Sequence, residues 1–314
     1  MALSSLLERN NPRVILVLGA SDTGKTTLIE RLLAEWNTAE AIAVVDCDVG
    51  QSHLGPPTTI GWGVITPPPV GRPKGASPLS GQAEGETGSL RLPPTGGGVT
   101  QPFQGWSHVP VRGIGFTGSV SPEGNLETFL QVASRVMQTA RQSASRLLVD
   151  TTGLVAGELG KTLKRRKAEF IKPDLILALQ RDQELEELLA GLSPVAIQRV
   201  AVSPGCVRRS LAQREAYRNK QFARYFANAA KQTLPLNRVG LIGLGPDWHT
   251  GNIVLSLDAL MDRVVGLRHG QGEDLALGLI RDVNPEDGTL TVFTPLRDVS
   301  GISTACVGSV RWPT

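Results

Sequence analysis

Two short motifs near the start of the chain carry residue types suited to phosphate chemistry. The first has the spacing of a phosphate-binding loop, a glycine, four residues, then Gly-Lys-Ser/Thr: Gly19, Ala20, Ser21, Asp22, Thr23, Gly24, Lys25 and Thr26. Backbone N–H groups of such a loop hold phosphate oxygens, and its lysine reaches the β- and γ-phosphates. The hydroxyl of Thr26 would bind Mg²⁺. We therefore predict that this loop, with Thr27 after it, binds a nucleoside triphosphate.

The second motif is Asp46-Cys-Asp-Val-Gly-Gln51, directly after the apolar stretch 41–45. In open parallel sheets, ligands bind outside the carboxyl ends of the strands, so Asp46 and Asp48 should face the loop. One carboxylate could help to hold Mg²⁺, and the other could accept a proton from an attacking hydroxyl. The alternative is that Asp46 caps a turn and Asp48 is a solvated loop residue.

The elements around these motifs predict a doubly wound α/β fold with a mostly parallel sheet. The apolar strand 14–18 precedes the loop, a helix from Thr26 to about Glu35 follows it, and strand and helix patterns alternate to about residue 225. Further strands are expected at 146–150, 173–179 and 199–202. The first of these ends in Asp150, which would contact Mg²⁺ through water; the alternative is a helix cap.

The segment 113–125 predicts a strand, a turn and a helix start. The following helix carries an apolar stripe from Leu126 to Ala140 that should be core. A basic helix is expected over about 205–231, with Arg214 and Arg218 four residues apart on one face. These arginines could contact a transferring phosphoryl group, or the face could simply be solvated. The shorter basic segment 161–167 is expected to be solvated surface, and the alternative is that it contacts a nucleic-acid backbone.

The rest of the chain divides into an insertion and a C-terminal domain. Residues from about 66 to 107 are rich in Pro and Gly, which predicts a flexible insertion. Stretches 275–280 and 289–293 alternate like antiparallel strands, with 284–288 as their turn. We therefore expect a P-loop α/β domain over 1–236 and a small β-rich domain over 237–314.

Composition excludes several classes of protein. The net charge of +3 is too small for a general nucleic-acid coat, and three isolated cysteines predict neither a disulfide framework nor a zinc site. No signal peptide or apolar run of membrane-spanning length is present, so we expect a cytoplasmic protein without membrane contact. The first strand begins about ten residues into the chain, which leaves no room for an additional N-terminal β domain.

Taken in order, the motifs resemble those of the P-loop polynucleotide 5′-hydroxyl kinases related to the cleavage-and-polyadenylation-factor kinase and the pre-rRNA-processing kinase. The resemblance rests on the GASDTGKT loop, the DCDVGQ motif continuing into Leu54-Gly-Pro-Pro57, the segment Gly118–Asn125 and the basic R-x-x-x-R pair. It extends over most of the chain apart from the Pro/Gly-rich insertion.

This resemblance implies ATP and Mg²⁺ as cofactors and the 5′-hydroxyl ends of RNA or DNA as substrates; it names no protein partner. It implies that Lys25 and Thr26 hold the phosphates and Mg²⁺, that Asp48 activates the hydroxyl, and that Arg214 and Arg218 close over the phosphoryl group. Asp46 and Asp150 complete the expected metal site. The residues expected to contact the substrate are Gln51, Ser121, Asn125 and Thr152.

One departure from the family pattern concerns base stacking. The family often has Thr-x-Gly-Trp after the later strand, whereas this chain has Thr151-Thr-Gly-Leu154. An ATP-binding scaffold without transfer activity is therefore an alternative. A nucleotide-switch ATPase or GTPase is another, although Gln180-Arg-Asp-Gln183 stands where a GTPase would carry its guanine-reading motif.

Overall fold

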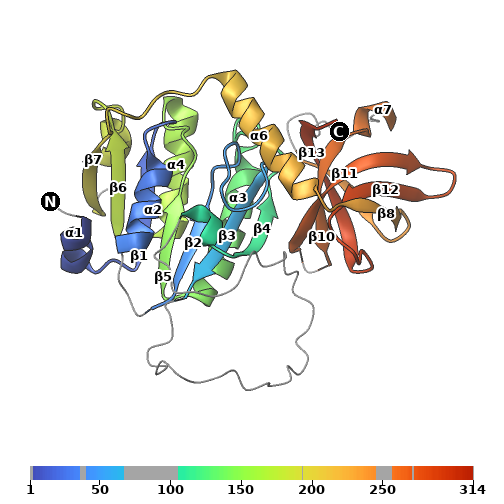
Figure 1. Cartoon of the computed structure of the whole chain (residues 1–314), viewed down its shortest axis with the longest axis horizontal. Coiled ribbons are helices and arrows are strands. Elements are labelled where there is room, and N and C mark those ends of the chain that lie inside the picture. Colours follow the sequence, from blue (N-terminus) through green and yellow to red (C-terminus); the bar gives the residue numbers. More distant parts are fainter. Residues whose placement is uncertain are drawn as a thin grey trace, which may run out of the picture.

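The computed structural model describes residues 3–35, 40–66, 105–192, 194–244, 257–270 and 272–313. The predicted insertion over about 66–107 therefore lies almost entirely outside the described residues. Two parts can be seen in Figure 1, an α/β layer structure and a set of C-terminal strands, with helix α6 running diagonally from one to the other.

The first part contains five parallel strands, and two antiparallel strands extend the sheet at one edge. Their order is β7-β6-β1-β5-β2-β3-β4, and pairing is parallel from β7 to β2. The strands are β1 (Val14–Gly19), β2 (Ile42–Asp46), β3 (Thr59–Ile65), β4 (Val111–Phe116), β5 (Arg146–Asp150), β6 (Leu175–Gln180) and β7 (Ala196–Ala201).

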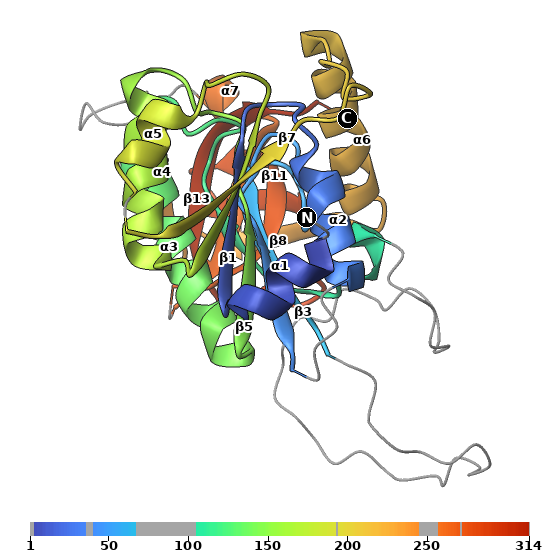
Figure 2. The same ribbon diagram turned by 90° about the vertical axis from the view of Figure 1, so that its left-hand side faces the viewer.

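Helices cover both faces of this sheet because its central strands are apolar on both sides. Figure 2 shows α3, α4 and α5 on one face and α1 and α2 on the other. The two faces have separate buried cores, built around α3 and α4 on one side and α2 on the other. The helices are α1 (Leu3–Asn10), α2 (Lys25–Glu35), α3 (Leu126–Ser143), α4 (Gly157–Ile171) and α5 (Glu186–Ala190), with a short 3₁₀ turn, η1 (Trp106–His108).

The C-terminal strands continue the same sheet through one contact. Strand β11 pairs with β4 at Asp274 and Ile114, and the path runs on through β10, β13 and β9, with β12 and β8 branching from β11. The remaining elements are α6 (Leu211–Phe226), β8 (Ala230–Pro235), β9 (Gly240–Gly243), α7 (Leu257–Leu260), β10 (Arg263–His269), β11 (Asp274–Asn284), β12 (Thr289–Thr294) and β13 (Ile302–Arg311).

A buried carboxylate secures this contact between the two parts. The Asp274 side chain is fully buried, accepts a hydrogen bond from the Phe116 backbone N–H (2.9 Å), and pairs with Arg135 of α3 (2.6 Å) and Arg268 of β10 (2.9 Å). Charge-assisted hydrogen bonds of this kind are roughly twice as strong as neutral ones. Asp274 therefore holds α3, β4 and β10 together.

The predicted fold class is confirmed, including the strands around the motifs and the β-rich C-terminal region. The hairpin over 275–293 is present, as β11 and β12 joined by a turn. Strand β8 already pairs with β12, so the C-terminal strands begin at Ala230, before the expected boundary at 236. The division into two folding domains itself stays a prediction. Within the described residues, no helix combines the length and apolar character needed to cross a membrane.

Candidate active site

The phosphate-binding loop joins β1 to α2, as its sequence predicts. Asp22 adopts a left-handed backbone conformation (φ 58°), which an aspartate tolerates better than most residues. The Lys25 side chain is buried, and its Nζ donates a hydrogen bond to the Ala20 carbonyl (2.8 Å). The ammonium group therefore lies across the loop, where bound phosphates would take the place of that carbonyl as its partner.

Asp46 organises the turn that follows β2. Its Oδ1 accepts a hydrogen bond from the Asp48 N–H (2.9 Å), and its Oδ2 accepts from the N–H groups of His53 (2.5 Å) and Leu54 (3.1 Å) and from the Ser52 hydroxyl (3.3 Å). Both oxygens are thus engaged within the turn. This is the turn-capping role that the sequence left open as an alternative, and direct metal ligation by Asp46 stays a prediction.

Asp48 lies on the same turn with one oxygen uncommitted. Its Oδ1 accepts hydrogen bonds from the N–H groups of Gly50 (3.2 Å) and Gln51 (3.1 Å), which fixes the carboxylate. Its Oδ2 accepts no hydrogen bond from the described residues. The side chain is half-buried, so a substrate hydroxyl can reach it. This geometry suits a general base.

Asp46 and Asp150 form a buried carboxylate pair at the ends of adjacent parallel strands, directly opposite each other in the register. Burial, and then the charge of Asp48, raises the pKa of Asp46 to about 6. Burial, and then the charge of Asp46, raises the pKa of Asp150 to about 7, against the opposing charge of Lys25. A divalent cation would relieve this repulsion, and carboxylate oxygens are ligands that Mg²⁺ prefers. The donor set therefore fits the predicted metal.

This pair gives a pH prediction for the protein without nucleotide and metal. Folding raises both pKa values above the ordinary 3.8, so the contribution of the pair to stability is largest at low pH and is lost progressively as the pH rises from about 4 to about 7. We expect Tm to fall over this range and then to level off, by about 2–4 °C for each kcal/mol lost. Asp150→Asn should flatten the dependence. A Tm that is constant or rising over this range in differential scanning calorimetry would contradict the prediction.

The loop after β5 packs against the phosphate-binding loop. A Cβ on Gly153 would lie 2.1 Å from the Ser21 Oγ and 2.5 Å from its backbone nitrogen, so only glycine allows this approach. Beside it, the Lys164 Nζ donates hydrogen bonds to the carbonyl (2.5 Å) and hydroxyl (3.0 Å) of Thr152. Lys164 therefore stabilises the loop after β5 through Thr152, the residue that was predicted to contact substrate.

The expectation that 161–167 is a solvated basic surface is wrong for two of its lysines. Lys164 and Lys167 are fully buried on the face of α4 that packs against the sheet. Burial, and then the charges of Lys167 and Lys25, holds the pKa of Lys164 well below its ordinary value. The Lys167 Nζ lies 5.4 Å from the centre of the Phe129 ring and beside the Cys47 thiol, and it forms no hydrogen bond of normal geometry with the described residues.

This contrast predicts opposite effects of the same substitution. Lys164→Met should lower the free energy of unfolding by about 1–3 kcal/mol, because it leaves the buried Thr152 carbonyl and hydroxyl without a donor. Lys167→Met should leave stability unchanged or raise it, because it removes a buried polar group that lacks a hydrogen bond. Urea denaturation of both variants tests this, and equal losses would refute the distinction.

The segment 118–125 lies beside the Asp46–Gln51 turn. A Cβ on Gly50 would come within 2.8 Å of the Val120 carbonyl oxygen, so the two backbones are in direct contact. Asn125 is buried, and its Nδ2 donates to the Thr117 carbonyl (2.8 Å), which fixes the segment rather than exposing the amide. Ser121 is half-buried, and its Oγ accepts from the Glu123 N–H (3.2 Å). Contact of either side chain with substrate stays a prediction.

Two arginines close the far side of the site onto the phosphate-binding loop. Arg209 donates to Asp22 through its backbone N–H and its Nε, each at 3.0 Å, and the Arg214 guanidinium pairs with the same carboxylate. Burial acts to raise the pKa of Asp22, but the hydrogen bonds from Arg209 and the charges of both arginines outweigh it and hold the pKa below its ordinary value. Gln51 reinforces this closure by donating to the Arg214 carbonyl (3.2 Å) and accepting from Arg209 (3.2 Å).

The helix α6 that carries Arg214 starts with a capping box between Ser210 and Gln213. Phe222 and Phe226 are buried on its inner face, and Tyr225 is partly buried there. Arg218 is half-buried one turn beyond Arg214 and forms no ion pair within the described part of the chain. The structure therefore brings Arg214 to the phosphate loop but not Arg218.

Sequence reasoning missed three side chains at this site: Arg209, His53 and Tyr217. The His53 Nε2 lies 3.4 Å from the Thr26 hydroxyl, and its Nδ1 lies 3.3 Å from the Tyr217 hydroxyl. Burial lowers the pKa of His53 despite the nearby charges of Asp150 and Asp48. The position of His53 two residues after the DCDVGQ motif was the available signal; Tyr217 and Arg209 are identified only by the closure of α6.

Comparison with known proteins identifies relatives along nearly the whole chain. The family described as mRNA cleavage and polyadenylation factor CLP1 P-loop matches residues 19–81 and 99–228, more than half of the chain. A polyribonucleotide 5′-hydroxyl-kinase of Thermococcus kodakarensis is 26% identical over 98% of this chain and 91% of its own length. Another, of Methanocaldococcus jannaschii, is 29% identical over 77% of this chain and 58% of its own length.

A solved structure has the same fold. The structure of Clp1p in its complex with Pcf11p superposes with a TM-score of 0.70, covering 98% of this chain and 78% of that one, at 17% sequence identity. At this identity the likeness concerns the fold alone. The coverage includes the C-terminal strands as well as the α/β part.

Proposed function

This chain belongs to the family of the mRNA cleavage and polyadenylation factor CLP1 P-loop, and we propose on this premise that it is an ATP-dependent polynucleotide 5′-hydroxyl kinase acting on RNA. The phosphate-binding loop of this family implies that the chain binds ATP. The observation that carries the proposal is that three features meet at the carboxyl ends of the parallel strands. They are the phosphate loop, the Asp48 carboxylate, whose Oδ2 accepts no hydrogen bond from the described residues, and Arg214 of helix α6.

The reaction forms a bond between the 5′-oxygen of the RNA and the γ-phosphorus of ATP and breaks the bond from that phosphorus to the bridging oxygen of ADP. We infer that the Asp48 Oδ2 takes the proton of the attacking hydroxyl, since its Oδ1 is held by the turn. Lys25 leaves the Ala20 carbonyl for the β- and γ-phosphates. Arg214, which contacts the phosphate loop, stabilises the negative charge that develops on the transferring group. Arg218, one turn further along α6, is a second candidate for this role, although it does not reach the loop in this structure.

Thr26 and Asp150, with Asp46 adjacent, are the residues that would hold Mg²⁺ in this proposal. Bound there, Mg²⁺ would neutralise charge on the β- and γ-phosphate oxygens. His53 would keep the Thr26 hydroxyl oriented, since its Nε2 lies within reach of that oxygen. Helix α6, with the arginines that precede and begin it, forms the lid of the site in this proposal. Gln51 links the Asp48 turn to α6 and thereby couples the general base to this lid.

Incubation of the protein with γ-labelled ATP and matched 5′-hydroxyl RNA and DNA oligonucleotides tests the proposal. Label should appear at the 5′ end of RNA and disappear with Lys25→Ala, and the DNA arm ranks the two substrates. ATP binding without label transfer to either oligonucleotide would overturn the kinase and favour the ATP-binding scaffold.

A further inference from the structure

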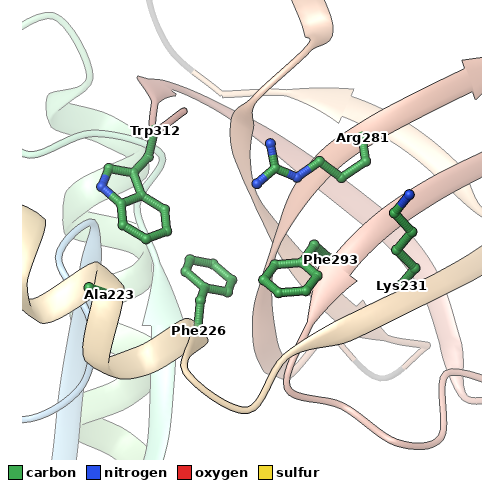
Figure 3. A pocket seen from close by; sticks show the side chains of 6 residues that line it. All are labelled: Ala223, Phe226, Lys231, Arg281, Phe293 and Trp312. Atoms are coloured by element: carbon green, nitrogen blue, oxygen red, sulfur yellow. The ribbon is translucent and has the colours of Figure 1, made fainter. Parts of the chain in front are cut away.

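A cavity of about 440 Å³ lies away from the phosphate loop, where the end of α6 meets the C-terminal strands. Figure 3 shows its lining, which combines aromatic rings with two basic side chains. The lining residues are Ala223, Phe226, Lys231, Arg281, Phe293 and Trp312. None of them belongs to the kinase site described above.

Three aromatic rings form one wall of this cavity. The rings of Trp312 and Phe226 are stacked (centroids 5.6 Å apart, 20° between planes), and those of Phe226 and Phe293 are 6.3 Å apart at 27°. Phe226 is buried, but Trp312 and Phe293 are only half-buried and border the open space. Only 4% of the chain is aromatic, so this concentration is unusual. Rings of this kind accept planar ligands by stacking.

Two basic side chains lie beside the Phe293 end of this wall (Figure 3). Lys231 of β8 lies directly opposite Phe293 of β12 in the strand register, and its side chain is exposed. The Arg281 guanidinium lies 5.8 Å from the centre of the Phe293 ring and is held there by an ion pair with Asp262. Planar rings beside cations match a ligand that is both planar and anionic, which is the chemistry of a nucleotide within a single strand.

Helix α6 connects this cavity to the kinase site. Arg214 contacts the phosphate loop and Phe226 lines the cavity, so the two sites are twelve residues, or about 18 Å, apart along the helix at 1.5 Å per residue. A stacked strand with about 3.4 Å per nucleotide covers this distance in about five nucleotides. A substrate bound by its 5′ end thus reaches the cavity only if it is several nucleotides long.

We propose that the cavity binds a base and its phosphate several nucleotides 3′ of the 5′ end that is phosphorylated, and so favours longer single-stranded RNA. This inference rests on the proposed kinase function. It assigns to the C-terminal strands a stacking site that the Thr151-Thr-Gly-Leu154 loop, with leucine in place of tryptophan, does not supply.

The test compares kcat/KM for a 5′-hydroxyl RNA dinucleotide and decanucleotide. Two variants alter the cavity: Trp312→Ala removes a stacking ring, and Ala223→Glu places a negative charge at its exposed edge. Lys220→Glu is the control, because it changes the charge of the same helix more strongly but does not line the cavity. Calorimetry verifies that each variant is folded, and Ala223→Glu keeps the test valid if Trp312→Ala unfolds.

We expect the parent protein to prefer the decanucleotide. Both cavity variants should lose at least about fivefold in kcat/KM on the decanucleotide, since base stacking on one aromatic residue is worth about 1–3 kcal/mol. Their values for the dinucleotide should equal that of the parent. Equal use of both lengths by the parent, or an equal loss with Lys220→Glu, overturns the inference but leaves the kinase standing. No phosphorylation of either length refutes the proposed function itself.

Discussion

Arg214→Ala is expected to lower kcat by about 10³-fold or more while the Kd for ATP changes little, because an arginine at the transferring phosphoryl group contributes about that much in related reactions. The structure supports this separation. Arg214 pairs with Asp22 of the phosphate loop, which places its guanidinium beside the expected phosphate site. ATP itself is expected to be held by the loop N–H groups and Lys25. Single-turnover kinetics and calorimetric titration with ATP measure the two quantities separately.

Arg224→Ala is the matched control, because Arg224 is an exposed arginine in the last turn of the same helix. Its kcat should equal that of the parent. Arg218→Ala should also cripple turnover if the second lid arginine acts as the resemblance implies, whereas Arg209→Ala should act mainly through the position of the lid. Full turnover in Arg214→Ala would remove the lid from the mechanism.

Asp22 gives the lid arginines a carboxylate partner on the phosphate loop. Its carboxylate is almost completely buried and pairs with Arg209 and Arg214. The pairing balances the negative charge of Asp22 and the positive charges of the two arginines. A γ-phosphate is a stronger acceptor than a single carboxylate and can take over Arg214. The loop thus carries the counter-ion that holds the lid arginine ready.

The parts of the site that are local in sequence were predictable. In the phosphate loop and in the Asp46–Gln51 turn, a few adjacent residues determine the chemistry. Both motifs follow the carboxyl ends of parallel strands, and these ends lie on the same side of the sheet. The apolar stripe of α3 was predictable for the same reason. Helical spacing alone places its side chains on one buried face.

The parts that depend on distant partners were not predictable. A lysine in a basic segment is normally solvated, and only the fold places the Thr152 carbonyl opposite Lys164. Arg209 reaches Asp22 across 187 positions in sequence. Strand β3 runs antiparallel to β2 and β4 runs antiparallel to β3, and β4 meets β11 through a single pair that Asp274 secures. No local pattern specifies such a contact.

Asp48→Asn is expected to reduce kcat by about 10²–10⁴-fold, the usual contribution of a general base. The amide keeps the shape of the carboxylate, and its oxygen can still accept from the N–H groups of Gly50 and Gln51. The fold and the ATP site should therefore be preserved, and only proton acceptance is lost. The measurements are kcat on 5′-hydroxyl RNA, the Kd for ATP, and Tm.

Asp46→Asn separates this effect from general damage to the turn. The Asp46 carboxylate accepts four hydrogen bonds, one at Oδ1 and three at Oδ2. In Asp46→Asn an NH₂ group replaces one of these oxygens, and it would face hydrogen-bond donors rather than acceptors. Asp46→Asn should therefore lower Tm as well as kcat, whereas Asp48→Asn should lower kcat alone. If Asp48→Asn lost stability to the same degree, or retained parental turnover, Asp48 would be a structural residue of the turn and the base would have to be sought among the other groups at this sheet edge.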